Sequence, residues 1–399
     1  MSDRPYPLDG VTVLDMGHIY NGPYAGFMLA MAGAHVIKIE PRTGEHLRHR
    51  GGHKAHSVPF ALLNSNKHCV TLNLKAPRGR ELFLEMVKKA DVVLENFAPD
   101  AMENMQLGWD VLRATNPRLI YGCSSGYGRS GPRRDDLAMD LTVQASSGVM
   151  SVTGFPDSPP LKAGAAVCDF SGGVHLYAAI MTALFERERT GEGRMVEVSM
   201  QEAIYASLCS NLGMYYSMGG KTPPRTGNQH GGLSISPYNV YPTNDGYAAI
   251  NCTNDNHFYN LLRVMGRSEL KDDPRYATNS ARAEILEEVN TLVESWTRTL
   301  TKDELLDISR KNDFPCAPVR DLDEVVHDEH LHERGMLQWI DHPVVGRIAV
   351  QNSPLRFHDS PLMPIEPSAD LGAHNDEIFG GWLGYSQTDV DDFRTQEII

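Results

Sequence analysis

The stretch VTVLDMGHIYNGPYAGFMLAMAGAHVIKIE, residues 11–40, decides the fold class of this chain. Residues 11–15 form a short apolar run closed by an acid, and residues 35–40 form a second apolar run. Between them, an alanine- and methionine-rich segment begins at Gly22-Pro23 and extends to about Ala32. Two strand-like runs separated by a helical segment predict a β–α–β unit with parallel strands.

The same alternation continues over roughly the first half of the chain. Further strand-like runs cover residues 69–74, 91–95 and 118–122. One intervening segment has its apolar residues at helical spacing, at Leu82, Phe83, Met86, Val87 and Ala90. Apolar strands that alternate with helices predict an α/β fold, with a mainly parallel sheet covered on both faces.

The character of the sequence changes near the loop KTPPRTGN, residues 221–228, which is typical of a linker. Beyond it, a strand-like run at residues 247–252 and several amphipathic helices predict a smaller α/β unit. Strand-like and proline-rich sequence returns at about Gly335. The expected parts are a large domain over residues 1–220, a small domain over 225–325 and a C-terminal segment over 330–399.

Composition argues against several classes of protein. The net charge of −14 does not favour a general nucleic-acid binder, which normally carries a basic face. The longest nearly apolar stretch, residues 174–185, is shorter than the roughly 20 residues of a membrane-spanning helix. The first ten residues lack the apolar core of a signal peptide, and the cysteines lie far apart. We therefore expect a cytoplasmic protein with reduced thiols and no membrane segment.

Two motifs suggest chemistry but have simpler structural explanations. Residues 122–126 match G-x-S-x-G around Ser124, yet a nucleophile elbow must lead straight into a helix, and loop-forming residues follow here. We interpret the motif as a strand-end loop. The histidines His327, His330 and His332 fit no standard zinc spacing, so the sequence predicts a solvated helix and no metal site. No dinucleotide-binding or P-loop motif is present.

Asp169 lies beside glycines, just before a long apolar helix expected to start near Val174. Its carboxylate is either the N-cap of that helix or a nucleophile placed where small residues let a substrate approach. The pattern alone favours the cap. Asp140 stands in an apolar run and has the same two explanations.

The chain resembles the class III CoA-transferases, the family of formyl-CoA and carnitine CoA-transferases, over nearly all of its length. The resemblance implies a Rossmann-like large domain that holds both termini, a small domain, and two protomers interlaced as a homodimer. It is carried by PLDGVTVLDMGHIYNGPYAGFMLAMAGAHVIKIEP (7–41), the N-x-N-K and L-x-L-K segment (64–75), ADVVLENF (90–97), NPRLIYGCSSGYGRSGP (116–132), Q-A-x-S-G (144–148), TGEGRMVEVSMQEA (190–203) and DDPRYATNSAR (272–282).

The resemblance implies that Asp169 is the nucleophile. It would attack an acyl-CoA thioester to form a mixed anhydride, take up the coenzyme as an aspartyl-CoA thioester, and release it to an incoming carboxylic acid. Asp140 would position the acceptor or tune Asp169, and Gly231-Gly232 would form the glycine loop that closes over the intermediate. Tyr20 stands where formyl-CoA transferase-like members have Gln, a departure that argues against the formyl/oxalate substrate pair.

The resemblance also implies where coenzyme A binds as a substrate, with no tightly bound cofactor. Arg42 is the expected phosphate partner, because the coenzyme's phosphates need cations. A family arginine is replaced by Asn104, so Arg129, Arg133 or Arg134 would compensate. The other expected contacts are Tyr20, Asn21, Leu72, Asn73, Leu74, Lys75, Asn96, Phe97 and Ala98.

An α-methylacyl-CoA racemase is the alternative, since those enzymes share the fold and the CoA site. They carry a His-Asp pair for proton transfer, and the corresponding residues here are Met139 and Asp140. Without the histidine, one of the two bases that transfer the proton in a racemase is missing. The sequence does not identify the donor acyl-CoA or the acceptor acid.

Overall fold

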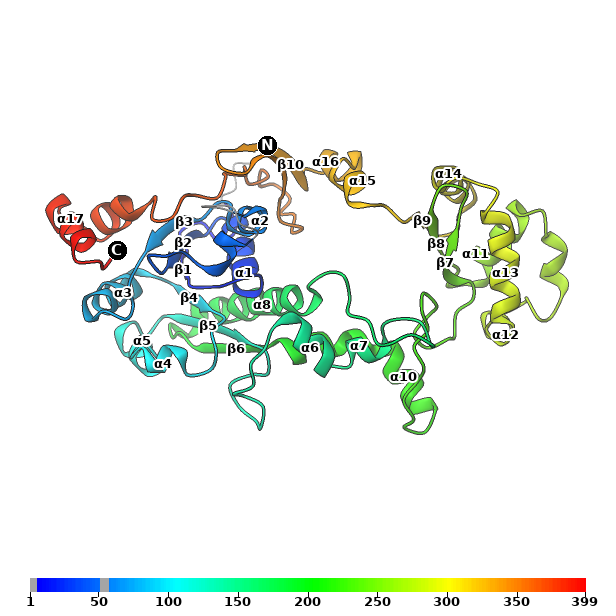
Figure 1. Cartoon of the computed structure of the whole chain (residues 1–399), viewed down its shortest axis with the longest axis horizontal. Helices are drawn as coiled ribbons and strands as arrows, with labels where there is room; N and C mark the ends of the chain where they lie inside the picture. The colour runs from blue at the N-terminus through cyan, green and yellow to red at the C-terminus, as the bar shows by residue number, and fades with distance from the viewer. Residues whose placement is uncertain (1–5, 51–56) are drawn as a thin grey trace. The chain divides into compact units, whose positions relative to one another are not determined.

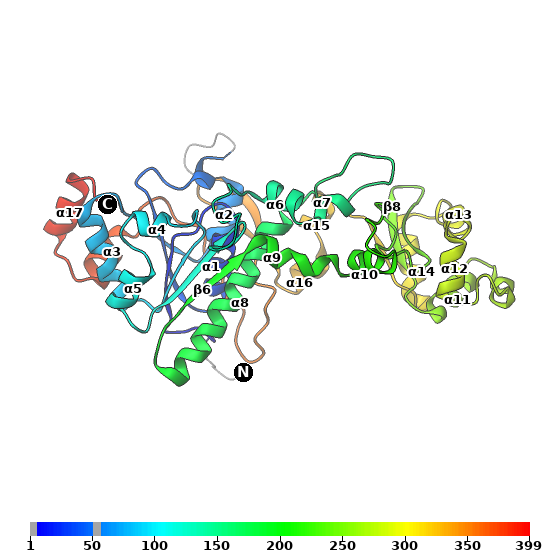
Figure 2. The same cartoon turned by 90° about the horizontal axis from the view of Figure 1, so that it is seen from below.

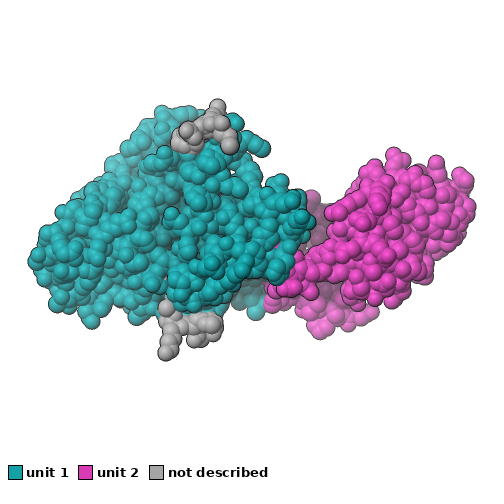
Figure 3. Space-filling model, turned by 90° about the horizontal axis from the view of Figure 1, so that it is seen from above, with its two compact units in different colours: residues 1–143, 165–204, 326–399 teal, residues 144–164, 205–325 magenta. Residues whose placement is uncertain are grey.

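In the computed structural model, which describes residues 6–50 and 57–399, the chain divides into two compact units (Figure 3). Unit 1 comprises Met1–Val143, Ala165–Ile204 and Val326–Ile399. Unit 2 comprises Gln144–Gly164 and Tyr205–Val325. The first unit is therefore discontinuous in sequence and contains the C-terminal segment.

Unit 1 is built on a six-stranded parallel sheet with the order β3-β2-β1-β4-β5-β6 (Figure 1). This order is that of a doubly wound, Rossmann-type sheet, as the sequence pattern predicted for the fold class. The strand β6 was not anticipated from the sequence. The strands are β1 (Thr12–Asp15), β2 (His35–Glu40), β3 (His68–Thr71), β4 (Val92–Glu95), β5 (Ile120–Ser125) and β6 (Met195–Ser199).

Helices cover both faces of the sheet (Figures 1 and 2). On one face, α3 (Pro77–Lys89) and α5 (Trp109–Thr115) share an apolar cluster with η4 (Asp376–Trp382) and α17 (Gln387–Thr395) near the C-terminus. On the other face, α1 (Asn21–Met31) and α8 (Val167–Thr190) form a second cluster. Successive strand residues alternate between the two clusters, because side chains along a strand point to opposite faces.

The helix α8 begins at Val167, well before the expected start near Val174. Gly172 and Gly173, which the expected start would leave outside the helix, lie inside it, where it packs on α1. A Cβ on Gly173 would lie 2.7 Å from the carbonyl oxygen of Asn21, so only glycine permits this approach. The helix is 24 residues long and apolar enough to cross a membrane by length and composition, but it buries Leu176 and Ile180 in the sheet cluster and is a core helix.

Unit 2 contains a three-stranded antiparallel sheet, β7 (Tyr238–Pro242), β8 (Tyr247–Asn251) and β9 (Cys316–Pro318). The helices α11 (Asp255–Val264), α13 (Leu286–Thr297) and α14 (Lys302–Asn312) pack on it through one apolar cluster. A capping box formed by Thr301 and Glu304 begins α14.

The boundaries of the units differ from the expected ones at two places, because residues 144–164 and 205–220 belong to unit 2. Residues 144–164 are joined to unit 2 by hydrogen bonds to the expected linker. Arg225 donates to the carbonyl oxygens of Phe155 and Pro156, and the Gly227 amide donates to Gly154 at 3.0 Å.

The remaining elements connect these layers or follow them. They are η1 (His46–His49), α2 (Val58–Asn64), α4 (Ala101–Asn104), α6 (Asp140–Ser146), α7 (Val149–Val152), α9 (Met200–Tyr205), η2 (Ala206–Leu208), α10 (Cys209–Ser217), η3 (Ser268–Asp272), α12 (Asn279–Glu284), α15 (Leu322–Val326), α16 (Glu329–Glu333), and the hairpin β10 (Leu337–His342) and β11 (Gly346–Gln351).

Candidate active site

The carboxyl ends of β1 and β4 form the centre of the candidate site. The strand order reverses between these two strands, and doubly wound sheets bind their ligands at such a switch point. The His18 amide, just after β1, donates to Oδ1 of Asn96, just after β4, at 2.7 Å. The Nδ2 of Asn96 donates to the His18 carbonyl oxygen at 3.0 Å. Asn96 therefore holds the two loops together.

Asp169 lies in the first turn of α8, and only 9% of its surface is exposed. The amides of Cys168 and Asp169 both donate to Oδ1 of Asp140, at 2.9 and 3.2 Å. Asp140 therefore caps the helix, and the cap that the pattern favoured for Asp169 is wrong. Within residues 6–50 and 57–399, no group donates a hydrogen bond to the Asp169 carboxylate, so it is available for chemistry.

Asp169 lines a cavity of about 260 Å³. The walls come from the loops after β1, β4 and β5 and from residues 134–139. Among the residues expected to bind CoA, Asn96, Phe97 and Ala98 line this cavity. A carboxylate at the edge of an open cavity beside a switch point is a suitable position for a nucleophile.

A second hollow of about 360 Å³ lies on the other side of His18 and Phe97. These two residues line both hollows, and their ring centroids are 4.8 Å apart. The second hollow collects most of the remaining residues expected to bind CoA, which are Arg42, Leu72, Asn73, Leu74 and Lys75. Two adjoining hollows, one with a carboxylate and one with cations, suit a substrate with an acyl end and a phosphate end.

Comparisons with known proteins agree with this geometry. Residues 8–375 match the model of the CoA-transferase family III. The chain is 36% identical to a formyl-CoA:oxalate CoA-transferase of Streptomyces avermitilis, over 98% of this chain and 99% of that protein. It is 35% identical to a succinyl-CoA–D-citramalate CoA-transferase of Chloroflexus aurantiacus, over 99% of this chain and 98% of that protein. The chain belongs to CoA-transferase family III.

A solved structure supports the same assignment. The crystal structure of a CAIB/BAIF family protein from Brucella suis superposes with a TM-score of 0.82 and 34% identity. The match covers 95% of this chain and 100% of that one. This family III chain is therefore a CoA-transferase, an enzyme that moves coenzyme A between an acyl-CoA and a carboxylic acid.

The cations of this CoA-transferase differ in their availability for phosphates. Lys75 forms no ion pair within the described part of the chain, whereas Arg42 lies 3.3 Å from the exposed Glu397. The three arginines expected to compensate for Asn104 already have acidic partners. These pairs are Arg129 with Glu103, Arg133 with Asp136, and Arg134 with Asp100.

Tyr20 and Asn21 line neither hollow. The Asn21 side chain is buried at the start of α1, and among residues 6–50 and 57–399 neither of its amide atoms has a hydrogen-bond partner. Gly231 and Gly232 lie in unit 2, where a Cβ on Gly231 would meet Asn211 of α10 at 2.9 Å. The glycine pair is therefore packed closely against its own unit.

Asp169 has a pKa raised from its ordinary value of 3.8 to about 7. Burial is the largest cause, the neighbouring Asp140 carboxylate adds to it, and the Arg50 guanidinium opposes it. A more basic carboxylate is a stronger nucleophile, but near neutral pH a substantial fraction of it is protonated. The raised pKa therefore makes the ionised Asp169 carboxylate more reactive, but the carboxyl group must be deprotonated before it can attack.

The transferase rate is expected to depend on this ionisation. Because only the carboxylate can attack, kcat/KM for the acyl-CoA donor should fall roughly tenfold per pH unit below about pH 7 and level off above about pH 8. The measurement is a pH–rate profile of the transfer reaction. A profile that stays flat down to about pH 5 would show that Asp169 ionises with its ordinary pKa instead.

The sequence did not single out several charged residues that support this site. The apolar strand β2 contains Lys38, whose Nζ donates to the Gly17 carbonyl oxygen at 2.7 Å. Asp15 accepts a hydrogen bond from the Gly17 amide at 2.7 Å and pairs with Lys67 at 2.7 Å. A charge inside a strand that is buried on both faces is the signal that could have identified Asp15 and Lys38. Burial and, to a lesser degree, the charge of Lys38 lower the pKa of His18 to about 4. The His18 ring is therefore neutral at pH 7.

The G-x-S-x-G motif does not form a nucleophile elbow, although Ser124 lines the cavity beside Asp169. Ser124 lies within β5, and the next helix, α6, starts at Asp140, so no strand-turn-helix elbow is formed. The His327 and His332 rings lie against Trp339, with centroids 5.4 and 6.0 Å away.

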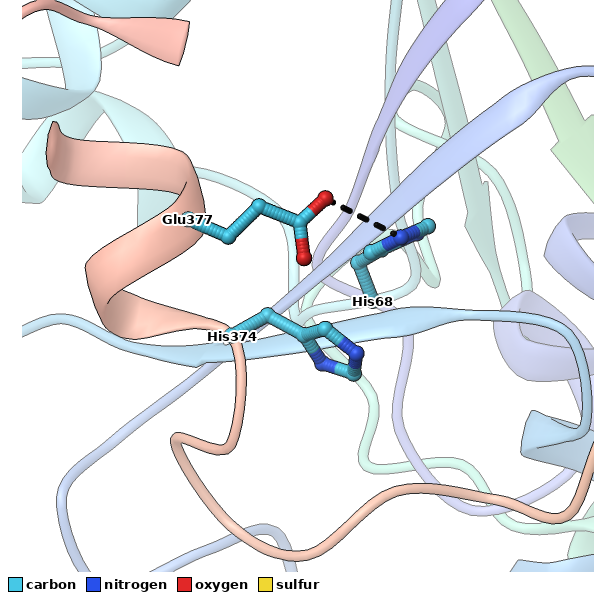
Figure 4. A group of neighbouring side chains, drawn as sticks. All are labelled: His68, His374 and Glu377. Carbon is cyan, nitrogen blue, oxygen red and sulfur yellow. Dashed lines mark ion pairs between the residues drawn. The ribbon is translucent and has the colours of Figure 1, made fainter. Parts of the chain in front are cut away.

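One group at the amino-terminal edge of the sheet has the composition of a metal site (Figure 4). His68 opens β3, His374 and Glu377 come from the C-terminal segment, and their ligand atoms lie within 4.8 Å of one another. The Cys69 amide donates to Nδ1 of His374 at 3.0 Å, so the neutral ring carries its proton on Nε2 and offers no lone pair there. The 3.4 Å ion pair between His68 and Glu377 instead joins the C-terminal segment to β3.

Proposed function

We propose that this family III enzyme transfers CoA through covalent intermediates on Asp169. An Asp169 oxygen attacks the donor thioester carbonyl, and CoA leaves as a thiolate. The thiolate attacks the Asp169 carbonyl of the resulting anhydride, which releases the donor acid and leaves an aspartyl-CoA thioester. The acceptor carboxylate attacks this thioester to form a second anhydride, and the thiolate then takes the acceptor acyl group and restores the Asp169 carboxylate.

The single observation that carries this proposal is the unoccupied Asp169 carboxylate beside a cavity, with Asp140 taking the capping role. A carboxylate whose oxygens accepted hydrogen bonds from helix amides would be less nucleophilic and less accessible. The raised pKa of Asp169 makes its carboxylate more nucleophilic than an ordinary aspartate. A thioester is an activated acyl group, and the ionised carboxylate can attack it without a general base.

The position of CoA follows from the two hollows. We infer that the thiol end reaches the cavity beside Asp169, while the phosphates lie near Lys75 and Arg42 in the second hollow. The neutral His18 and Phe97 stand between them and would line the passage of the pantetheine arm. Arg42 would exchange its exposed partner Glu397 for phosphate at little cost, since an exposed ion pair contributes at most about 1 kcal/mol.

The racemase alternative gains no support from the site. Met139 occupies the position of the histidine base, and Asp140 is committed to the amides of α8. We therefore propose acyl transfer, with the acids still to be assigned. The relatives' names include both oxalate and larger dicarboxylates, and Tyr20 in place of a glutamine argues for the larger ones.

We also propose that the enzyme works as a homodimer. Large apolar side chains are exposed on unit 1 of the isolated chain, a feature typical of a subunit interface. They are Leu137, Leu141, Val174 and Phe185. Light scattering at micromolar concentration should give twice the chain mass of 44.2 kDa, and the monomer mass would refute the dimer.

The proposed mechanism is tested by trapping the intermediate. The protein is incubated with acetyl-CoA or succinyl-CoA without an acceptor, and the products are examined by peptide mass spectrometry. Hydroxylamine should convert the activated carboxyl into a hydroxamate located on Asp169. A hydroxamate on another acid, or exchange of the α-proton without any adduct, would refute the proposal.

A further inference from the structure

Arg50 is hydrogen-bonded to Tyr20, the residue that precedes α1. It follows η1, and its Nη1 donates a hydrogen bond to the Tyr20 hydroxyl at 3.0 Å. The guanidinium carbon lies 5.7 Å from the centre of the Tyr20 ring. Because the arginine is the donor, the Tyr20 hydroxyl proton remains available to a ligand.

Tyr20 in turn packs on the residue next to the nucleophile. Its ring stacks on Phe170 at 5.9 Å with an interplanar angle of 18°. Tyr24 meets the edge of Phe170 at 4.9 Å and fixes that ring from the other side. Arg50, Tyr20 and Phe170 therefore form one contiguous group, and Phe170 is the chain neighbour of Asp169.

Arg50 has no acidic partner of its own in the described part of the chain, and its side chain is exposed. Its positive charge acts on Asp169, since it lowers the pKa of that carboxyl against burial and Asp140. Arg50 is thus held by a tyrosine hydroxyl and has no acidic partner in the described part of the chain. Such a guanidinium is suited to bind an anion through two parallel hydrogen bonds.

The chemistry of the second half-reaction shows when that anion is needed. Once Asp169 is converted to a thioester, its negative charge is gone, and the positive charge of Arg50 no longer has this carboxylate to act on. The incoming acid must use one carboxylate to attack the thioester, and this charge passes to the CoA thiolate. Only a second carboxylate stays charged throughout, and it is the group that could remain on Arg50 during the reaction.

We propose that Arg50, together with the Tyr20 hydroxyl, binds the second carboxylate of a dicarboxylic acid acceptor. This inference rests on the proposed function, because it places the first carboxylate on the Asp169 thioester. It makes Arg50 and Tyr20 the residues that select dicarboxylic over monocarboxylic acids.

The test compares acceptors with one and two carboxylates. Succinate and glutarate are assayed against propionate and butyrate with Arg50→Gln, Arg50→Lys and Tyr20→Phe, above about pH 8, where Asp169 is ionised. For Arg50→Gln, KM for succinate or glutarate should rise roughly tenfold to a hundredfold, with KM for the monocarboxylates unchanged. Arg50→Lys should restore part of the loss, because it keeps the charge without the planar fork.

The control is Arg298→Gln, which removes an exposed arginine at the C-terminal end of α13. This variant should leave KM unchanged for both classes of acceptor. Equal losses for both classes in Arg50→Gln, or a wild-type enzyme that does not use dicarboxylates, would overturn the inference. The hydroxamate on Asp169 is measured in the same variants. Its absence from the wild type refutes the proposed function, whereas its presence with no acceptor discrimination refutes only the role of Arg50.

Discussion

Replacing Asp169 by asparagine is expected to abolish CoA transfer. The amide cannot attack a thioester or carry CoA as a thioester, so both covalent intermediates are lost together. Removal of a nucleophile that acts in every step typically lowers kcat by about 10⁴-fold or more. The measurement is chromatographic detection of the new acyl-CoA after prolonged incubation, with the hydroxamate assay as a second readout.

The same variant is expected to be more stable than the wild type at neutral and alkaline pH. The folded-state pKa of Asp169 is about 7 against an ordinary value of 3.8, so the folded protein binds this proton more tightly than the unfolded chain. Stability is therefore lost as pH rises from about 4 to 7, and a difference of about three in pKa corresponds to roughly 4 kcal/mol at most. Asparagine carries no charge and avoids this cost.

The stability control separates a lost function from a lost fold. Thermal unfolding of Asp169→Asn and wild type should show a difference in Tm that grows from pH 5 to pH 8. Inactivity combined with higher stability identifies Asp169 as a functional residue. Residual activity above about 1% of the wild type, or lower stability at pH 8, would count against the assigned role.

The fold was predictable from the sequence because each strand of the six-stranded sheet except β6 lies within a mainly apolar run. The segment containing β1, α1 and β2 has clear ends, a terminal acid before the turn and a glycine-proline pair at the start of the helix. The strand β6 was missed because it carries Glu197 and only half-buried apolar residues at the sheet edge. Its pairing with β5 depends on partners far away in sequence, which local patterns do not reveal.

The candidate site was predictable in part. The sequence pointed to Asp169 and Asp140 but left the roles of the two acids open, since either could cap a helix. Only the three-dimensional structure shows that Asp140, from a separate segment, accepts the amides of α8. Arg50 was missed for the same reason, because nothing in the local sequence connects it to Tyr20. Long-range contacts therefore decide the roles, while local sequence limits the candidates.

Replacing Lys67 by methionine is expected to destabilise the fold by about 3–5 kcal/mol. Lys67 and Asp15 are both fully buried, and Nζ of Lys67 lies 2.7 Å from Oδ2 of Asp15. The ammonium also donates to the Pro23 carbonyl oxygen and to Oδ1 of Asn64, so all three of its protons are used. Methionine fills the volume but leaves the Asp15 carboxylate buried with a single remaining cation, Lys38.

The measurement is urea unfolding at pH 7, with Lys88→Met as the control, because Lys88 is an exposed lysine of α3. The double variant Asp15→Asn/Lys67→Met removes both charges and should recover part of the lost stability, since a buried pair costs desolvation that a neutral pair avoids. A loss of stability below about 1 kcal/mol in the single variant would mean that water reaches the pair.

Because Asp15 also accepts a hydrogen bond from the Gly17 amide, the single variant Lys67→Met should also raise KM for the acyl-CoA, through displacement of the loop that carries His18.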